Sequence, residues 1–196
     1  MFSSSPGRRE RKKAATRDAI ANAALKLFLE KGFDGVSIKD IADLADVSTT
    51  TVFKHFPSKE ALLFDQDADQ EAQLLSAVQN RPAGQSALQA LCGFFVAHTQ
   101  AIHQDPRMED FIQLVTRTPA LMEYGRRMWT RHGAALARVL ALDAGRPAGD
   151  FTAAALAHFV LEIPHLVRGH PDPATAFKDA FEVLEKGWGS MHAAPA

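Results

Sequence analysis

The sequence predicts an all-α protein in two parts. Apolar residues recur at helical spacing along almost the whole of its 196 residues, and no segment shows the strict alternation of a β-strand. Short segments rich in Gly, Pro, Asp and Ser separate these runs and supply the residues that begin and end helices. Two predicted helices near the N-terminus are much shorter than the others, and the second of them ends before Pro57. We therefore divide the chain into residues 1–57 and residues 58–196.

The first element is a long helix, predicted over Thr16–Lys31. Gly32 directly after it is the usual helix stop, because glycine reaches the left-handed backbone conformation without strain. Its apolar stripe consists of Ile20, Ala24, Leu27 and Phe28. The small-residue segment Met1–Gly7 ahead of it is typical of a disordered tail.

The stretch Ser37–Glu60 predicts two short helices joined by a tight turn. Ser37 is a suitable N-cap for the first helix, and Ser48 is one for a second helix over Thr49–Phe56. Pro57 then stops the chain from continuing as a helix. The apolar face of the first helix consists of Ile38, Ile41, Ala42 and Ala45.

The second short helix has one apolar and one polar face. Val52 and Phe56 lie on the apolar face with Phe53 beside them. Small polar residues begin the opposite face and cations end it, which is the layout of a recognition helix that meets base edges with its first turn and phosphates with its flanks. The expected DNA-binding residues are Ser37, Ser48, Thr49, Thr50, Thr51, Phe53, Lys54, His55 and Lys59.

Many residues of this stretch also stand at fixed spacing. They are Ser37-Ile38-x-x-Ile41-Ala42, Val47-Ser48-x-x-Thr51-Val52-Phe53-x-His55-Phe56 and Pro57-Ser58-Lys59-Glu60-x-Leu62, preceded by Arg17, Ile20 and Gly32-Phe33. Together they resemble the signature of the tetracycline-repressor-like (TetR) transcriptional regulators over the first third of the chain. The resemblance implies a helix-turn-helix repressor that binds palindromic operator DNA as a homodimer and is released by a small-molecule ligand.

Two positions depart from the usual pattern of that family. Phe53 stands where the family usually has Tyr, so a phosphate contact through a hydroxyl is lost. Thr50 replaces a smaller residue, often Gly or Ala, which changes the surface offered to the bases. Neither change disturbs the fold, but both leave the operator sequence open.

The charge distribution agrees with DNA binding at one end of the molecule. The net charge is -1, but residues 1–60 hold 11 Lys and Arg against 8 Asp and Glu. A cluster of cations opens this part: Arg8, Arg9, Arg11, Lys12 and Lys13. It is either the solvated start of the first helix or an arm that lies along phosphates or enters the minor groove.

Several classes of protein are excluded or disfavoured by composition. Cys92 is the single cysteine, so the chain has neither an intrachain disulfide nor a cysteine-based zinc cluster. No segment approaches the roughly 20 apolar residues of a membrane span, and the N-terminus lacks the apolar core of a signal peptide. We therefore expect a cytoplasmic protein. Phosphate-binding loops and nucleophile elbows are also missing, so no enzyme class is favoured.

The C-terminal part predicts a series of longer helices over about Ser58–Gln79, Gln85–Gln104, Met108–Val115, Pro119–Leu142, Phe151–Arg168 and Pro173–Met191. The resemblance implies that this part binds an apolar or amphipathic effector. The candidate lining residues are Phe94, Phe95, His98, Met108, Phe111, Met122, Trp129, His158, Phe159 and Glu162. A helical core needs large side chains in any case, so ordinary packing stays open for each of them.

The resemblance also implies that the last two helices pair with those of a second copy. Small residues that permit close helix approach are Ala153, Ala154 and Ala157, and residues that supply apolar area are Phe181, Leu184 and Trp188. The helix expected over Ser58–Gln79 would belong to both parts of the chain. Such a stiff helix would pass a ligand-induced tilt to the recognition helix.

A metal site is the main alternative use of the C-terminal part. His158, Glu162 and His165 share one helix face, and His98 and His103 lie on another helix. This pattern matches half of a di-iron carboxylate site, but the second half is missing and Pro164 distorts the spacing. We expect no metal or other cofactor. A metal-dependent oxidase and a regulator controlled by a partner protein remain the alternative hypotheses.

Overall fold

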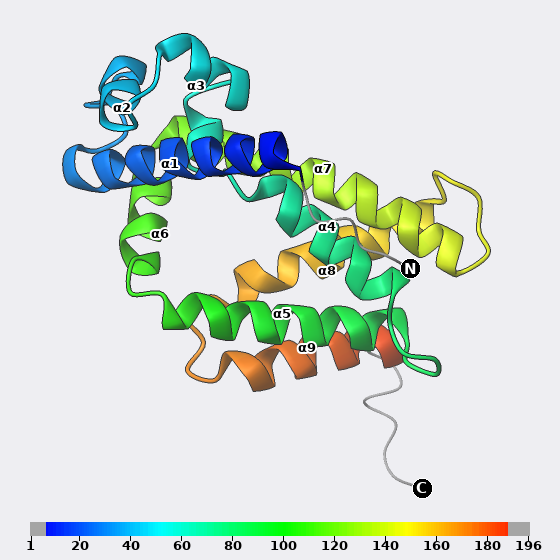
Figure 1. Cartoon of the computed structure of the whole chain (residues 1–196). Helices are drawn as coiled ribbons and strands as arrows, with labels where there is room; N and C mark the ends of the chain where they lie inside the picture. The colour runs from blue at the N-terminus through cyan, green and yellow to red at the C-terminus, as the bar shows by residue number, and fades with distance from the viewer. Residues whose placement is uncertain (1–6, 188–196) are drawn as a thin grey trace, which may run out of the picture. The chain divides into compact units, whose positions relative to one another are not determined.

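The computed structural model of the chain describes residues 7–187, except for the side chain of His103. Within this range the secondary structure is helical and contains no strand (Figure 1). The predicted all-α class is therefore confirmed. Trp188 and Met191, which were expected to extend the last helix, lie outside the described residues, as do residues 1–6.

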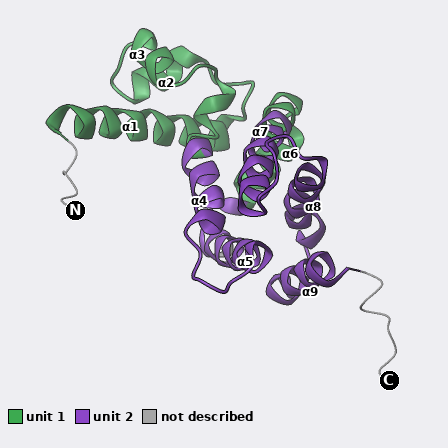
Figure 2. Ribbon diagram, turned by 90° about the vertical axis from the view of Figure 1, so that its right-hand side faces the viewer, with its two compact units in different colours: residues 1–66, 109–125 green, residues 67–108, 126–196 purple. Residues whose placement is uncertain are grey.

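The helices pack into two compact units (Figure 2). Unit 1 consists of residues 1–66 and 109–125, and unit 2 consists of residues 67–108 and 126–196. The helix α7 (Pro119–Asp143) begins in unit 1 and continues in unit 2. A functional boundary after residue 57 stays a prediction, because these units divide the chain by packing and not by function.

Unit 1 is built on α1 (Arg8–Lys31), which is longer than expected because the basic cluster is helical from Arg8. Two short helices follow, α2 (Ile38–Leu44), which packs on α1, and α3 (Thr49–His55), which packs on α2 (Figure 1). The core of the unit contains Ile20, Phe28, Ile41, Val52, Phe56, Leu62 and Leu121. Each apolar stripe predicted for these helices contributes to this core.

The turn between α2 and α3 is tight. Asp46 adopts a positive φ of 52°, a conformation that short polar residues such as Asp tolerate better than most. The backbone N–H of Val47 then donates to the carbonyl of Ala42 at 3.0 Å. These two features turn the chain within three residues, so the N-terminus of α3 begins directly at its cap, Ser48.

The single helix expected over Ser58–Gln79 is not formed. A short 3₁₀ turn, η1 (Glu60–Leu62), is followed by non-helical residues 63–66, and α4 starts only at Asp67 (Asp67–Gln79). Tertiary contacts explain the break. Phe64 stacks on Tyr124 at 5.2 Å, and the carbonyl of Asp65 accepts a hydrogen bond from Arg17 at 2.8 Å. These partners are distant in sequence, so periodicity did not reveal the break.

Unit 2 contains α4, α5 (Ala87–Gln104), most of α7, α8 (Phe151–Val167) and α9 (Pro173–Lys186). Serine and aspartate caps begin three of them: Ser86, Asp150 and Asp172 accept from the backbone of the first turn of α5, α8 and α9. The helices α5 and α9 lie side by side (Figure 1). Phe95 of α5 stacks on Phe177 of α9 at 5.8 Å and lies 6.1 Å from Phe181.

Replacing Phe95 by alanine should destabilise the protein strongly. Phe95 is only 3% exposed, so Phe95→Ala leaves a cavity between α5 and α9 and should cost about 3–5 kcal/mol of unfolding free energy. Phe94 is the matched control, because it is only half-buried. Chemical denaturation of both variants measures the difference, and equal losses would contradict this packing.

Candidate nucleic-acid interface

The helix α3 buries one face and exposes the other. Val52 is 1% exposed and Phe56, directly after the helix, is 1% exposed, so both are held in the core of unit 1. Thr49, Thr50 and Lys54 are exposed, and the ring of Phe53 is 56% exposed. An aromatic ring left at the surface of so short a helix is available for contact with a partner.

Ser48 and Thr51 are engaged at the start of α3. Ser48 Oγ accepts from the backbone N–H of Thr51 at 3.1 Å, and the two hydroxyl oxygens lie 2.8 Å apart. Thr51 is also half-buried. These two side chains therefore fix the first turn, and Thr49 and Thr50 are the residues of that turn that face outward.

Ser37 is engaged in a capping box at the start of α2. Its backbone N–H and its hydroxyl both donate to Asp40 Oδ2, at 2.8 and 2.6 Å, while Ser37 Oγ accepts from the backbone N–H of Asp40 at 3.2 Å. The hydrogen bonds from Ser37 lower the pKa of the Asp40 carboxyl. The Asp40 carboxylate already accepts the hydrogen bonds of Ser37 at the N-terminus of α2. The phosphate contact expected from Ser37 therefore has little support.

Arg17 connects three parts of unit 1. Its Nη1 donates to the carbonyl of His55 at 2.8 Å, and its Nη2 donates to the carbonyl of Asp65 at 2.8 Å. The guanidinium also lies 4.2 Å above the ring of Phe56. The His55 carbonyl is at the C-terminus of α3, where helix carbonyls lack intrahelical partners, so a cation of α1 caps the end of α3.

His55 lies where α3 meets the basic half of α1. Partial burial lowers the pKa of His55, and the positive charges of Arg17 and Lys13 lower it further. Because Lys13 acts on His55, the basic start of α1 and the C-terminal end of α3 form one cationic region.

Lys59 has a structural role that the sequence did not indicate. Its Nζ donates to the carbonyl of Phe33 at 2.5 Å and lies 4.3 Å from the centre of the Phe33 ring and 5.7 Å from that of Phe28. An ammonium group has three donors, and one of them is used here. A phosphate contact by Lys59 stays a prediction beside this internal one.

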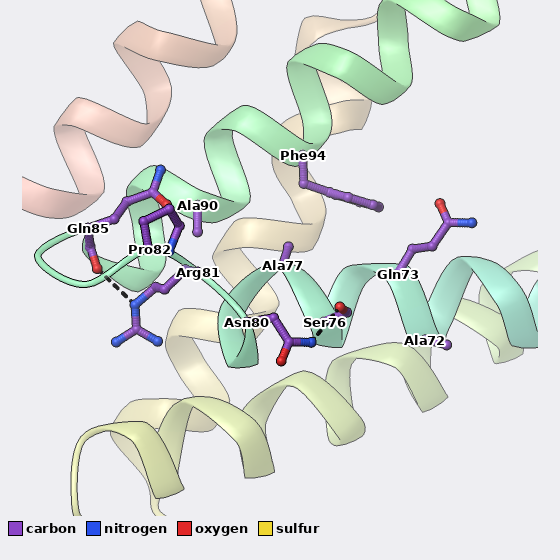
Figure 3. A pocket seen from close by; sticks show the side chains of 10 residues that line it. All are labelled: Ala72, Gln73, Ser76, Ala77, Asn80, Arg81, Pro82, Gln85, Ala90 and Phe94. Atoms are coloured by element: carbon purple, nitrogen blue, oxygen red, sulfur yellow. Dashed lines mark hydrogen bonds between the residues drawn. The ribbon is translucent and has the colours of Figure 1, made fainter. Parts of the chain in front are cut away.

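The expected effector residues of unit 2 lie in different surroundings. Phe94 lines an open groove of about 630 Å³ between α4 and α5, and its ring points toward the part of α4 that carries Gln73 (Figure 3). Arg81 at one end of the groove is bound to the carbonyl of Gln85 (Figure 3).

Other expected effector residues of unit 2 have neighbours of their own. Phe95 is part of the core with α9, as described above. His98 stacks on Phe94 at 5.7 Å, and burial lowers the pKa of His98. Trp129 packs edge-on against His132 at 5.4 Å and against His165 at 6.4 Å, while Met108 is half-buried.

The expected residues of α8 lie on its outer face. His158, Phe159 and Glu162 are exposed, and the ring of Phe159 is 54% exposed. The helical period explains this, because α8 turns Ala153, Ala157, Val160, Ile163 and Val167 inward. The described residues of unit 2 therefore give no support to the expectation that the three outer side chains line a cavity.

Two effector candidates belong to unit 1. Phe111, on α6 (Met108–Arg117), packs edge-on against Phe64 at 6.2 Å and joins the core of the unit. Met122 is 47% exposed. The expectation that both residues contact the effector stays a prediction.

Of the residues expected at a dimer contact, some are buried in their own chain and others are exposed. Ala153, Ala157 and Phe181 are buried in their own chain, whereas Ala154 is exposed and Leu184 is half-buried. The apolar area that α8 exposes comes instead from Phe151 at 83%, Phe159 at 54% and Leu166 at 77%. A helix viewed end-on places these three residues on one side, with Glu162 among them.

Apart from His103, the residues considered for a metal lie in the described part of the chain. In the described part of the chain no three His, Cys, Asp or Glu side chains come together at ligating distance. The side chain of His103 lies outside that part. None of the described helices is both long and apolar enough to cross a membrane.

Comparison with known proteins identifies the same N-terminal region. The family model "Bacterial regulatory proteins, tetR family" matches residues 20–65. The regulator TcmR of Streptomyces glaucescens is 36% identical over 149 residues, which are 71% of this chain and 65% of TcmR. The putative mycofactocin biosynthesis regulator MftR of Mycobacterium tuberculosis is 28% identical over 190 residues, 90% of this chain and 93% of that protein.

A solved structure extends the likeness to the fold. The SmeT–triclosan complex superposes with a TM-score of 0.56 at 21% identity, over 86% of this chain and 89% of that chain. At this identity the likeness concerns the fold alone. The chain spans about two thirds of the length of TcmR, so what that whole protein does is carried over only as a proposal.

Lys59→Ala should destabilise unit 1 and Lys54→Ala should not. Lys59→Ala removes the hydrogen bond to Phe33 and the cation–π contacts, so we expect a loss of about 1–2 kcal/mol. Lys54 is exposed and should change stability by less than about 0.5 kcal/mol. Thermal unfolding followed by circular dichroism compares the two, and a neutral Lys59→Ala would show that the internal contact contributes nothing.

Proposed function

Since this chain belongs to the tetR family of bacterial regulatory proteins, we propose that it is a cytoplasmic transcriptional repressor that binds operator DNA and is released by a small molecule. In this proposal α3 enters the major groove. Thr49 and Thr50 contact base edges, and Lys54 and His55 contact phosphates. The methyl groups of the threonines suit contact with thymine.

The observation that carries the proposal is that α3 buries one face in the core and exposes the other. Its buried side chains fix it in the core of unit 1, its N-cap fixes its first turn, and the described contacts give Thr49, Thr50 and Lys54 no structural role. A rigid helix with an outward polar face at one end of a cationic region is what major-groove reading requires. Phosphates near His55 would favour its protonated form, so DNA binding and proton uptake are expected to be linked.

A homodimer is part of the proposal. The outer face of α8 exposes large apolar side chains, and contact with a second copy would remove them from water. A two-fold contact there would be isologous, so each residue of the face would be used twice. Two copies of α3 would then read a palindrome with half-sites about one helical turn, ~34–36 Å, or a multiple apart.

An apolar or amphipathic effector is the third part of the proposal. The groove between α4 and α5 combines alanine side chains and the ring of Phe94 with the amides of Gln73, Asn80 and Gln85. Its volume of about 630 Å³ is within the range typical of small-molecule sites, about 300–1,000 Å³. The SmeT–triclosan complex is an example of this fold in complex with triclosan.

Thr50→Ala and Lys54→Ala should affect DNA binding in different ways. Sequences that bind the unaltered protein are first selected from random duplex DNA, and a palindromic motif is expected. Thr50→Ala removes a base contact and should change which sequences are selected. Lys54→Ala removes a phosphate contact, so it should weaken binding to all sequences alike and reduce the slope of log affinity against log salt by about one.

The proposal fails if the unaltered protein selects no sequence. The assignment of roles fails if Thr50→Ala lowers the affinity for selected and random duplexes equally. Thr49→Ala should likewise change which sequences are selected, since Thr49 is exposed in the same turn and is also assigned to a base contact.

Leu166→Asp should separate the dimer. A carboxylate in the middle of a two-fold apolar contact meets its own copy, so desolvation and repulsion both oppose pairing. Leu44→Asp is the control, because Leu44 is an exposed leucine of α2. Sedimentation equilibrium at micromolar concentration should give a monomer for Leu166→Asp and a dimer for Leu44→Asp. A dimer in both cases would place the contact elsewhere.

A further inference from the structure

Phe53 is the large apolar side chain that α3 exposes. Its ring is 56% exposed, whereas Val52 before it and Phe56 just after the helix are each 1% exposed. The exposed polar residues of α3 are Thr49, Thr50 and Lys54. In the proposed function the two threonines contact base edges and the lysine contacts a phosphate, whereas the ring of Phe53 has no assigned partner.

Phe53 lies one helical turn after the two threonines. It follows Thr50 by three residues and Thr49 by four, and residues at these spacings are neighbours on one face of a helix. An aromatic side chain on a helix also leans back over the preceding turn. A duplex that brings base edges to Thr49 and Thr50 therefore brings an adjacent base to the ring of Phe53.

The chemistry of a phenyl ring limits what it can contact there. The ring has no donor or acceptor for a hydrogen bond to a phosphate or to a polar base edge. A polar edge held against it would lose water without gaining a partner, which costs free energy. The C5 methyl group of thymine is the apolar group that bases present in the major groove, and Phe is among the side chains that contact it. A thymine methyl is therefore the base group that suits this ring.

The surroundings of the ring favour DNA over a protein partner. Lys54 beside it is exposed, and the cationic region formed by the start of α1 and the end of α3 reaches His55, two residues further along. The centre of a protein–protein contact is depleted of charged residues. The ring of Phe53 is instead flanked on α3 by hydroxyl and cationic side chains. A polyanion with methyl groups in its groove matches this composition.

We propose that Phe53 is a specificity-determining residue whose ring packs against the C5 methyl group of one thymine in each half-site. This inference rests on the proposed function, since it requires α3 to lie in the major groove. Cytosine at that position would offer an amino group and no methyl, and a purine would offer polar acceptors. The protein would therefore select thymine there without forming a hydrogen bond to it.

Deoxyuridine in place of thymine tests the contact, because it removes the methyl group and keeps the base pairing. The duplex is the one selected by the unaltered protein, and each thymine position is replaced in turn in both half-sites. The readout is the ratio of the affinities for the thymine and deoxyuridine duplexes. It is measured for the unaltered protein, Phe53→Ala and Phe53→Leu. Thermal unfolding of each variant should change little, because the ring is largely exposed.

We expect one thymine position at which the unaltered protein loses about threefold to fivefold in affinity per half-site, the effect of burying one methyl group. In Phe53→Ala the loss at that position should fall below about 1.5-fold, because no ring is left to bury the methyl. Phe53→Leu keeps an apolar side chain and should keep most of the loss. Ratios at thymines that the threonine methyl groups contact should be the same in all three proteins.

Lys54→Ala is the matched control, since Lys54 is the exposed neighbour of Phe53 and is assigned to a phosphate. It should weaken binding to the thymine and deoxyuridine duplexes equally and leave every ratio unchanged. If Phe53→Ala also weakens binding without changing any ratio, the ring packs on the DNA backbone and the inference is wrong. A selected sequence in which no thymine shows the loss would overturn it as well. If the unaltered protein selects no duplex at all, the proposed function itself fails.

Discussion

The burial of the apolar faces of α2 and α3 against α1 is the interaction on which the rest of unit 1 depends. Each of these two helices has seven residues, which is well below the length at which a helix is stable alone in water, about 12–15 residues. They exist because Ile41, Val52 and Phe56 are packed in the common core. The outward face of α3 is therefore set by the residues that must face inward.

Charge is used inside the unit as well as on its surface. Arg17 and Lys59 both donate to backbone carbonyls and lie over aromatic rings, so these two cations of the helix-turn-helix region serve the fold. Lys54 and the basic first turns of α1 are exposed. A count of positive residues does not separate the cations that stabilise the fold from those that are exposed. Their contacts in the structure do.

The sequence predicted what depends on local chemistry. The spacing of apolar residues and caps such as Ser37 and Ser48 located most helices to within a few residues. The break at residues 63–66 depends on Phe64 meeting Tyr124 and on Arg17 meeting Asp65, and such distant partners leave no periodic signal. Large apolar residues such as Phe95 and Phe159 look alike in sequence, but one is core and the other is exposed.

The most direct test of the central claim is to locate α3 on DNA. A reagent that cleaves DNA through hydroxyl radicals can be attached at Thr50→Cys in a Cys92→Ser background, since Cys92 is the single cysteine. Bound to the selected duplex, it should cut in two clusters about one helical turn, ~34–36 Å, or a multiple of it apart. Cleavage spread evenly along the duplex would show that the outward face of α3 does not enter the groove, and the account would be wrong.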